Sequence, residues 1–215
     1  MTDVKIIAVV SGKGGVGKTM LSVALANELS RGCKTLLFDL DFFNHGLTGL
    51  LAPLKSRIIT REVDAPQFIK QRSDNIWSIA EVSNNLFMIY YDDLIKSEAD
   101  FLEIHDTQEL SRELLTYIEY LLNETGCQFA VLDCHGGPDN TSFAACAIAT
   151  RVVLVSEPDK VTLHGTLNFL RVLRQHACDA SPNIYLVFNK IVAAFSPIFL
   201  LNFYDQYLKG EFNGN

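Results

Sequence analysis

The residues with the clearest chemical potential lie near the N-terminus, where Ser11–Thr19 reads SGKGGVGKT. Gly12, four further residues and Gly17-Lys18-Thr19 have the spacing of a phosphate-binding loop. Glycines let the backbone curl so that successive N–H groups point at phosphate oxygens, and a following helix adds its positive dipole end. We expect the Lys18 ammonium to reach the β- and γ-phosphates of a nucleotide and the Thr19 hydroxyl to bind Mg²⁺. The predicted nucleotide-binding residues here are Gly12, Lys13, Gly14, Gly15, Val16, Gly17, Lys18, Thr19 and Met20.

Carboxylates end two apolar runs further along the chain. Asp39 and Asp41 follow residues 34–38, and Asp133 ends the run FAVLD at residues 129–133. Ligands of open parallel sheets bind at the carboxyl ends of the strands. The Asp-x-Asp spacing directs the side chains of Asp39 and Asp41 toward one face. These carboxylates are therefore expected at the same edge as the glycine-rich loop.

The elements that would position these groups alternate between apolar strands and amphipathic helices, which predicts an α/β fold. We expect a mostly parallel, twisted sheet with helices on both faces, in three α/β/α layers. The first helix is expected to bury a stripe of Met20, Leu21, Ala24, Leu25 and Leu29. The predicted strands are 4–10, 34–39, 86–91, 128–133, 151–156 and 183–189, and the predicted helices are 18–31, 107–125, 139–149 and 160–177. Residues 52–84 show no sustained periodicity.

Composition favours a single folded domain over residues 1–215, with 48% hydrophobic residues. We find neither a run long enough to span a membrane nor a signal peptide, so a cytoplasmic location is expected. A net charge of −7 argues against non-specific nucleic-acid binding. The five cysteines are scattered, and reduced, mostly buried thiols are expected.

The loop contains a second lysine, Lys13, and the segment KGGVGKT resembles the deviant Walker A loop of the ParA/MinD family of P-loop ATPases. The second motif of that family is an Asp-x-Asp after the second strand, and its Walker B motif is an apolar run that ends in Asp. The resemblance covers residues 4–190. It implies ATP and Mg²⁺ as ligands and a nucleotide-dependent homodimer.

The resemblance also implies residue roles. Lys13 would act on phosphates bound by the partner subunit, and Lys18 on those bound by its own. Asp41 would orient or activate the attacking water, so the implied catalytic residues are Lys13, Lys18 and Asp41. Mg²⁺ would be held by Thr19, supported by Asp39 and bound by Asp133 through a water. Asn189 would hydrogen-bond the adenine edge, and a turn-forming Asn at a strand end is the alternative.

The implied function is a switch that binds and slowly hydrolyses ATP and dimerises face to face with MgATP. It would position or segregate a cellular or plasmid cargo, with a protein partner that stimulates hydrolysis. A phosphotransferase similar to the bacterial tyrosine kinases is one alternative. Those relatives carry an Arg where Phe43 stands and a Tyr-rich tail, whereas only Tyr204 and Tyr207 lie near the end here. A non-catalytic, nucleotide-responsive scaffold is the other alternative.

Two features depart from the family. Only 25 residues follow Asn189-Lys190, which fits either a minimal form or part of a longer protein and weakens the preference for ATP over GTP. Residues 196–215 lack the basic amphipathic character of membrane-binding tails and favour a core-packing or partner helix. Neither DNA nor membrane binding is therefore predicted. His135 follows the Walker B run and could contact phosphate, although a partly exposed loop histidine is the simpler interpretation.

Overall fold

The computed structural model describes residues 4–42, 44, 46–51, 59–69, 76–92, 106–176, 183–191 and 205. Predictions about Phe43, Cys178, Tyr204 and Tyr207 lie outside the described residues, as does nearly all of the tail 196–215. In the described part of the chain, no helix is long and apolar enough to cross a membrane.

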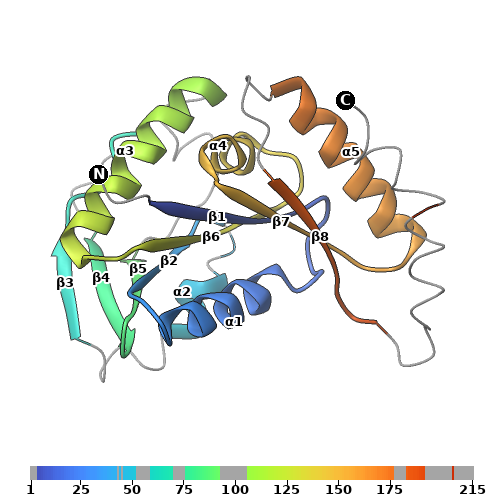
Figure 1. The fold of residues 1–215 in the computed structure, drawn as a ribbon. Coiled ribbons are helices and arrows are strands. Elements are labelled where there is room, and N and C mark those ends of the chain that lie inside the picture. Colours follow the sequence, from blue (N-terminus) through green and yellow to red (C-terminus); the bar gives the residue numbers. More distant parts are fainter. Residues whose placement is uncertain are drawn as a thin grey trace.

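Eight strands of the described residues form one sheet in the order β3-β4-β5-β2-β6-β1-β7-β8 (Figure 1). All neighbours from β5 to β8 in this order are parallel, whereas β3, β4 and β5 pair antiparallel. The expected mostly parallel sheet is confirmed. The strands are β1 Lys5–Ser11, β2 Thr35–Asp39, β3 Ile59–Val63, β4 Ile76–Ser83, β5 Leu86–Asp92, β6 Phe129–Gly136, β7 Arg151–Ser156 and β8 Asn183–Phe188.

Strands β3 and β4 occupy the stretch that showed no periodicity in the sequence. Arg61 and Glu62 of β3 are exposed, because β3 is an edge strand and charges are common at sheet edges. A two-residue turn joins β4 to β5, and its Asn85 has φ 64°, a conformation that Asn tolerates better than most residues. The dipeptide Asn84-Asn85 before an apolar run was the available hairpin signal.

Helices cover both faces of the sheet, as expected (Figure 1). Helices α1 (Lys18–Ser30) and α2 (Gly46–Leu51) lie on one face, and α3 (Thr107–Thr125), α4 (Asn140–Ile148) and α5 (Lys160–His176) lie on the other. Asp106 caps α3, because its carboxylate accepts hydrogen bonds from the backbone N–H groups of Gln108 and Glu109. Gly126 ends α3 with φ 68°.

The central strands are buried on both sides, and their side chains alternate between two apolar cores. Leu36 and Phe38 of β2 belong to the larger core, on the side of α3 and α4. Leu37 lies between them in sequence and packs with Ala26 in the smaller core beneath α1. The same alternation determines on which face of the sheet the charged side chains at the strand ends lie.

The predicted buried stripe of α1 is wrong. Met20 is 66% exposed and Ala24 is also exposed, whereas Ser22, Ala26 and Ser30 are buried. The small residues allow α1 to lie close to the sheet, and Ser22 also gains a hydrogen bond there. Leu21, Leu25 and Leu29 are only partly buried at the flanks of this contact.

The four described cysteines are free, as expected. Cys127, Cys134 and Cys146 are buried, and Cys33 is partly so. Burial raises the pKa of the Cys127 thiol to about 11, against weaker opposing effects from Thr125 and Lys34. These buried thiols therefore remain protonated and unreactive near neutral pH.

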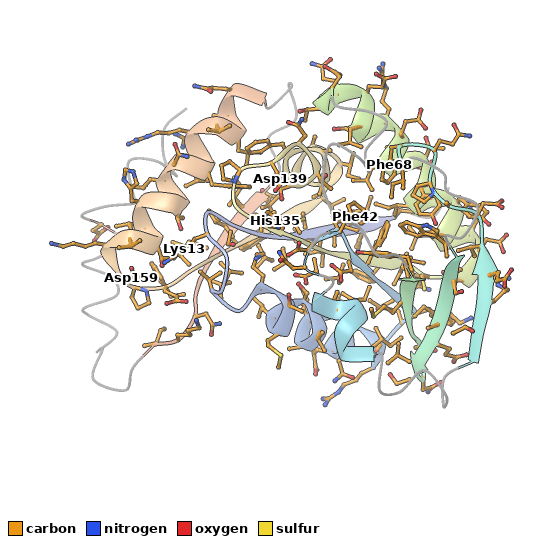
Figure 2. All side chains as sticks on the ribbon, turned by 180° about the vertical axis from the view of Figure 1, so that it is seen from behind. Lys13, Phe42, Phe68, His135, Asp139 and Asp159 are labelled. Atoms are coloured by element: carbon orange, nitrogen blue, oxygen red, sulfur yellow. The ribbon has the colours of Figure 1, made fainter. Side chains whose placement is uncertain are left out.

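An aromatic cluster holds the segment that follows β2. Phe42 is 1% exposed, and its ring centroid lies 6.4 Å from those of Phe38 and Trp77 and 5.7 Å from that of Tyr91. Trp77 of β4 stacks on Tyr91 of β5 at 4.7 Å. Figure 2 shows Phe42 among the side chains of this region. The antiparallel β4–β5 hairpin therefore anchors the chain immediately after Asp41.

We expect Phe42→Ala to lower the free energy of unfolding by about 3–5 kcal/mol, because it leaves a cavity among rigid aromatic rings. Tyr185→Ala removes an aromatic side chain that is 49% exposed on β8, and about 1 kcal/mol or less is expected from it. Denaturant unfolding followed by circular dichroism measures both changes. Similar losses for the two variants would contradict the anchoring role of Phe42.

Candidate functional site

The glycine-rich loop connects β1 to α1 and turns sharply through two glycines. Gly15 has φ 80°, and Gly17 has φ 92° at the N-cap of α1. Only glycine adopts this left-handed conformation without cost. A Cβ atom built at Gly14 or Gly15 would meet nothing within 4 Å, so open space remains beside this part of the loop. Lys18, the first residue of α1, is only 7% exposed.

Two close backbone contacts hold this loop in place. A Cβ on Gly12 would lie 2.1 Å from the carbonyl carbon of Gly165 in α5, and one on Gly165 would lie 2.8 Å from the Gly12 oxygen. A Cβ on Gly136, at the end of β6, would lie 2.6 Å from Gly14 Cα. Gly165 was missed by the sequence analysis, because a glycine inside a helical pattern does not reveal what it packs against.

Asp39 and Asp133 are direct neighbours, because the parallel register of β2 and β6 pairs them. Both carboxylates are buried. The Ser22 hydroxyl of α1 donates a hydrogen bond of 2.8 Å to Asp133 Oδ1, and Thr19 also hydrogen-bonds this carboxylate. Burial raises the pKa of Asp133, although the bonds from Thr19 and Ser22 and the charge of Lys18 oppose that rise.

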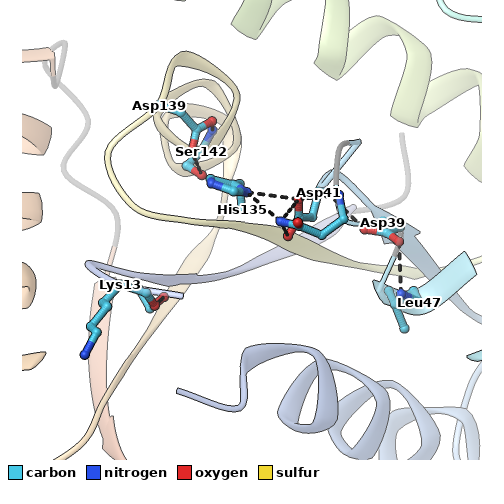
Figure 3. A network of polar contacts seen from close by, with 9 residues as sticks. Lys13, Asp39, Asp41, Leu47, His135, Asp139 and Ser142 are labelled. Carbon is cyan, nitrogen blue, oxygen red and sulfur yellow. Dashed lines mark hydrogen bonds and ion pairs between the residues drawn. The ribbon is translucent and has the colours of Figure 1, made fainter. Parts of the chain in front are cut away.

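Asp39 organises the backbone that follows β2. Its Oδ1 accepts a hydrogen bond of 3.0 Å from the N–H of Asp41, and its Oδ2 accepts one of 3.1 Å from the N–H of Leu47 in α2 (Figure 3). These bonds stabilise the buried carboxylate and position the chain around Asp41. The predicted association of Asp39 with the metal remains a prediction.

Asp41 pairs with His135 at the carboxyl ends of β2 and β6 (Figure 3). Its Oδ1 lies 2.9 Å from Nδ1 of His135, and the Asn44 side chain donates bonds of 3.0 and 3.1 Å to its two oxygens. Burial raises the pKa of Asp41, but the hydrogen bonds from His135 and Asn44 outweigh burial and leave it lowered. The hydrogen bond to Asp41 raises the pKa of His135. His135 is thus partly exposed, as expected, but it lies at the end of β6 and not in a loop, and its side chain is bonded to Asp41.

Lys13 points away from this carboxylate cluster. It is exposed, and Figure 2 shows it on the side of Asp159. In Figure 3 its side chain extends away from Asp41 and His135. Its positive charge helps to lower the pKa of Asp159, after the larger effect of the hydrogen bonds from Thr162. Within one chain, Lys13 therefore does not join Asp41 and His135.

Asn189 and Lys190 follow β8 and bind carbonyl groups of the loop. Asn189 Nδ2 donates a hydrogen bond of 2.8 Å to the Val16 oxygen, and Lys190 Nζ donates one of 2.6 Å to the Gly15 oxygen. Lys190 also forms an ion pair of 2.8 Å with Glu157. The end of β8 thus lies against the loop, and the expected contact of Asn189 with the adenine edge stays a prediction.

The donor set fits Mg²⁺ bound together with a polyphosphate. The described residues contain no group of three or more His, Cys, Asp or Glu side chains that could hold a metal ion by themselves. Mg²⁺ usually takes one or two protein oxygens and completes its shell with phosphates and waters. Thr19 and Asp133 offer such oxygens, and they lie beside the buried Lys18. The open loop at Gly14 and Gly15 leaves room for phosphates.

A curled glycine-rich loop lies between a parallel strand and a helix, and a carboxylate lies on the neighbouring strand. Together these features define the P-loop NTPase fold. A family model described as an AAA domain matches residues 4–185. The chain belongs to this family, and its resemblance to the ParA/MinD proteins is confirmed by the relatives described next.

Individual relatives agree with this assignment. The septum site-determining protein MinD of Neisseria meningitidis is 24% identical over 212 residues, which are 96% of this chain and 70% of that protein. A plasmid partition protein of Borrelia burgdorferi superposes with a TM-score of 0.60 at 21% identity, over 95% of this chain and 87% of that one. The MgADP complex of Pyrococcus horikoshii MinD superposes with a TM-score of 0.56 at 20% identity, over 93% and 77% of the two chains.

We expect Gly165→Ala to lower the free energy of unfolding by about 1–3 kcal/mol, because its methyl group would press against the Gly12 backbone. The same displacement should weaken the binding of a fluorescent nucleotide. Gly49→Ala is the control, since Gly49 lies in α2 with open space around its Cβ position, and it should be neutral or stabilising by up to about 1 kcal/mol. Denaturation and a nucleotide titration test both variants, and equal behaviour would rule out the role of the α5 contact.

Proposed function

We propose that the chain is an ATP-binding switch that hydrolyses ATP slowly and dimerises face to face when MgATP is bound. The observation that carries this proposal is the position of Asp133, which lies beside the loop and interacts with the charges of both Lys18 and Asp41. A phosphate-binding cation, a metal-binding carboxylate and a water-orienting carboxylate thereby share one site.

Each residue near the phosphates has a proposed task. Lys18 binds the β- and γ-phosphates, and the curled backbone around Gly15 and Gly17 directs N–H groups at their oxygens. Thr19 and Asp133 hold Mg²⁺, and the Asp39 carboxylate supports this arrangement from the neighbouring strand. The metal ion, when bound, neutralises negative charge on the β- and γ-phosphate oxygens. Asn189, whose side chain bonds the Val16 oxygen of the loop, is the residue proposed to contact the base.

Hydrolysis requires a positioned water and stabilisation of the charge on the transferred phosphoryl group. Asp41 is the proposed water-orienting residue, and hydrogen bonds keep its carboxylate ionised at neutral pH. Lys13 extends away from its own Asp41, which suits a lysine that acts on phosphates in a partner subunit. Dimerisation would then complete two sites at once.

The output of such a switch is the lifetime of the dimer. The relatives named for septum-site determination and plasmid partition support a role in positioning or segregating a cargo, in which a protein partner accelerates hydrolysis. We propose this role for the chain.

Lys18→Ala should abolish MgATP binding, because a buried cation and its contacts with phosphate are lost. Lys34→Ala is the matched control, since Lys34 is exposed before β2 and bonds the Thr125 carbonyl at 3.3 Å. Isothermal titration with MgATP measures both. Tight binding by the Lys18 variant would contradict the assignment of the loop.

Asp41→Ala should shift from a 24.0 kDa monomer with MgADP to a species of twice that mass with MgATP, because hydrolysis no longer releases the dimer. Light scattering coupled to gel filtration measures the mass. Lys13→Ala in the same background should remain monomeric in both nucleotides. A monomeric Asp41 variant in MgATP would refute the dimeric switch.

A further inference from the structure

The contact between His135 and Asp41 joins two segments that are far apart in the chain. Nδ1 of His135 lies 2.9 Å from Oδ1 of Asp41, and the pair connects the end of β6 with the segment that follows β2. The two side chains are partly sheltered, with 36% of His135 and 16% of Asp41 exposed. In this environment a hydrogen bond to a carboxylate restrains its orientation more strongly than at an open surface.

The hydrogen bonds of Asp41 are distributed unevenly between its oxygens. Within the described residues, Oδ1 accepts from the Asn44 N–H at 3.3 Å, from the Asn44 side chain at 3.0 Å and from His135. Oδ2 accepts only the Asn44 side chain there, at 3.1 Å. A carboxylate held mainly through Oδ1 keeps a free lone pair on Oδ2 for a water molecule.

His135 is itself positioned relative to the phosphate-binding loop. The next residue, Gly136, packs so closely on Gly14 that a Cβ would lie 2.6 Å from the Gly14 Cα. Gly137 donates its N–H to the Ser11 oxygen at 3.0 Å. Asn44 lies in the same segment as Asp41, and although its Nδ2 also lies 3.4 Å from Nδ1 of His135, it does not by itself connect Asp41 to the loop. The His135 contact connects Asp41 to the loop, because the next residues, Gly136 and Gly137, pack against it.

We propose that His135 is the positioning residue for hydrolysis, whose Nδ1–H holds Oδ1 of Asp41 so that Oδ2 faces the attacking water. This inference rests on the proposed ATPase function and adds to it the group that fixes Asp41 relative to the phosphates. His135 acts through Asp41 and makes no contact with the reacting atoms.

The test compares the 215-residue wild-type chain with His135→Ala and His135→Asn in single-turnover hydrolysis of labelled MgATP. His135→Ala should lower the rate about 10- to 100-fold, the loss typical of a misplaced catalytic group, with the Kd for MgATP changed less than about two-fold. His135→Asn should recover most of the rate, because its side-chain N–H₂ lies near the position of Nδ1. An unchanged or faster His135→Ala variant would overturn the proposal.

A double variant separates positioning from an independent role. Adding His135→Ala to Asp41→Ala should cause no further loss of the residual rate, because the carboxylate that His135 holds is already absent. A further loss as large as that seen in the wild-type background would overturn the proposal. If His135→Ala does not fold, the comparison of His135→Asn with His135→Gln tests the proposal. The longer Gln places its donor nearer to the position of Nε2, so His135→Gln should be slower. Equal hydrolysis rates for these two variants would overturn the inference.

The same measurements separate the two proposals. A wild-type chain that binds MgATP without hydrolysing it overturns the ATPase function and the inference with it. A wild-type chain that hydrolyses ATP and loses this activity with Asp41→Ala, but not with His135→Ala, overturns the inference alone.

Discussion

The parallel register between β2 and β6 is the constraint on which the site depends. It pairs Asp39 with Asp133, and both carboxylates face the layer that contains α1. Each then takes hydrogen bonds from a different element, Asp133 from Ser22 and Asp39 from the N–H groups of Asp41 and Leu47. Buried carboxylates require such partners, so the register also determines where α1 and the segment after β2 can lie.

The loop is confined from several sides by other parts of the fold. Helix α5 touches Gly12 through Gly165, β6 touches Gly14 through Gly136, and the end of β8 binds the carbonyls of Gly15 and Val16. A loop held in this way is largely organised before a ligand arrives, which reduces the entropy lost on binding.

The segment that contains Asp41 is held between an aromatic anchor and a polar contact. Phe42 lies within the cluster of Trp77 and Tyr91, and the adjacent Asp41 bonds His135. The antiparallel β3–β4–β5 extension thus supports the carboxylate, although it lies beyond the strands that surround the loop. The packing of Phe42 and the hydrogen bond of Asp41 together restrain both the position and the direction of the Asp41 side chain.

The sequence alone predicted the loop, the carboxylates at the strand ends and most elements, because glycine spacing and apolar periodicity are local properties of the chain. It failed for the edge strand β3, which has mixed charges, for its neighbour β4, and for the buried face of α1, where Ser22 replaces an apolar residue. Gly165 and His135 acquire their roles only from neighbours distant in sequence. The tertiary structure alone decided those contacts, because strand register and helix packing determine which side chains meet.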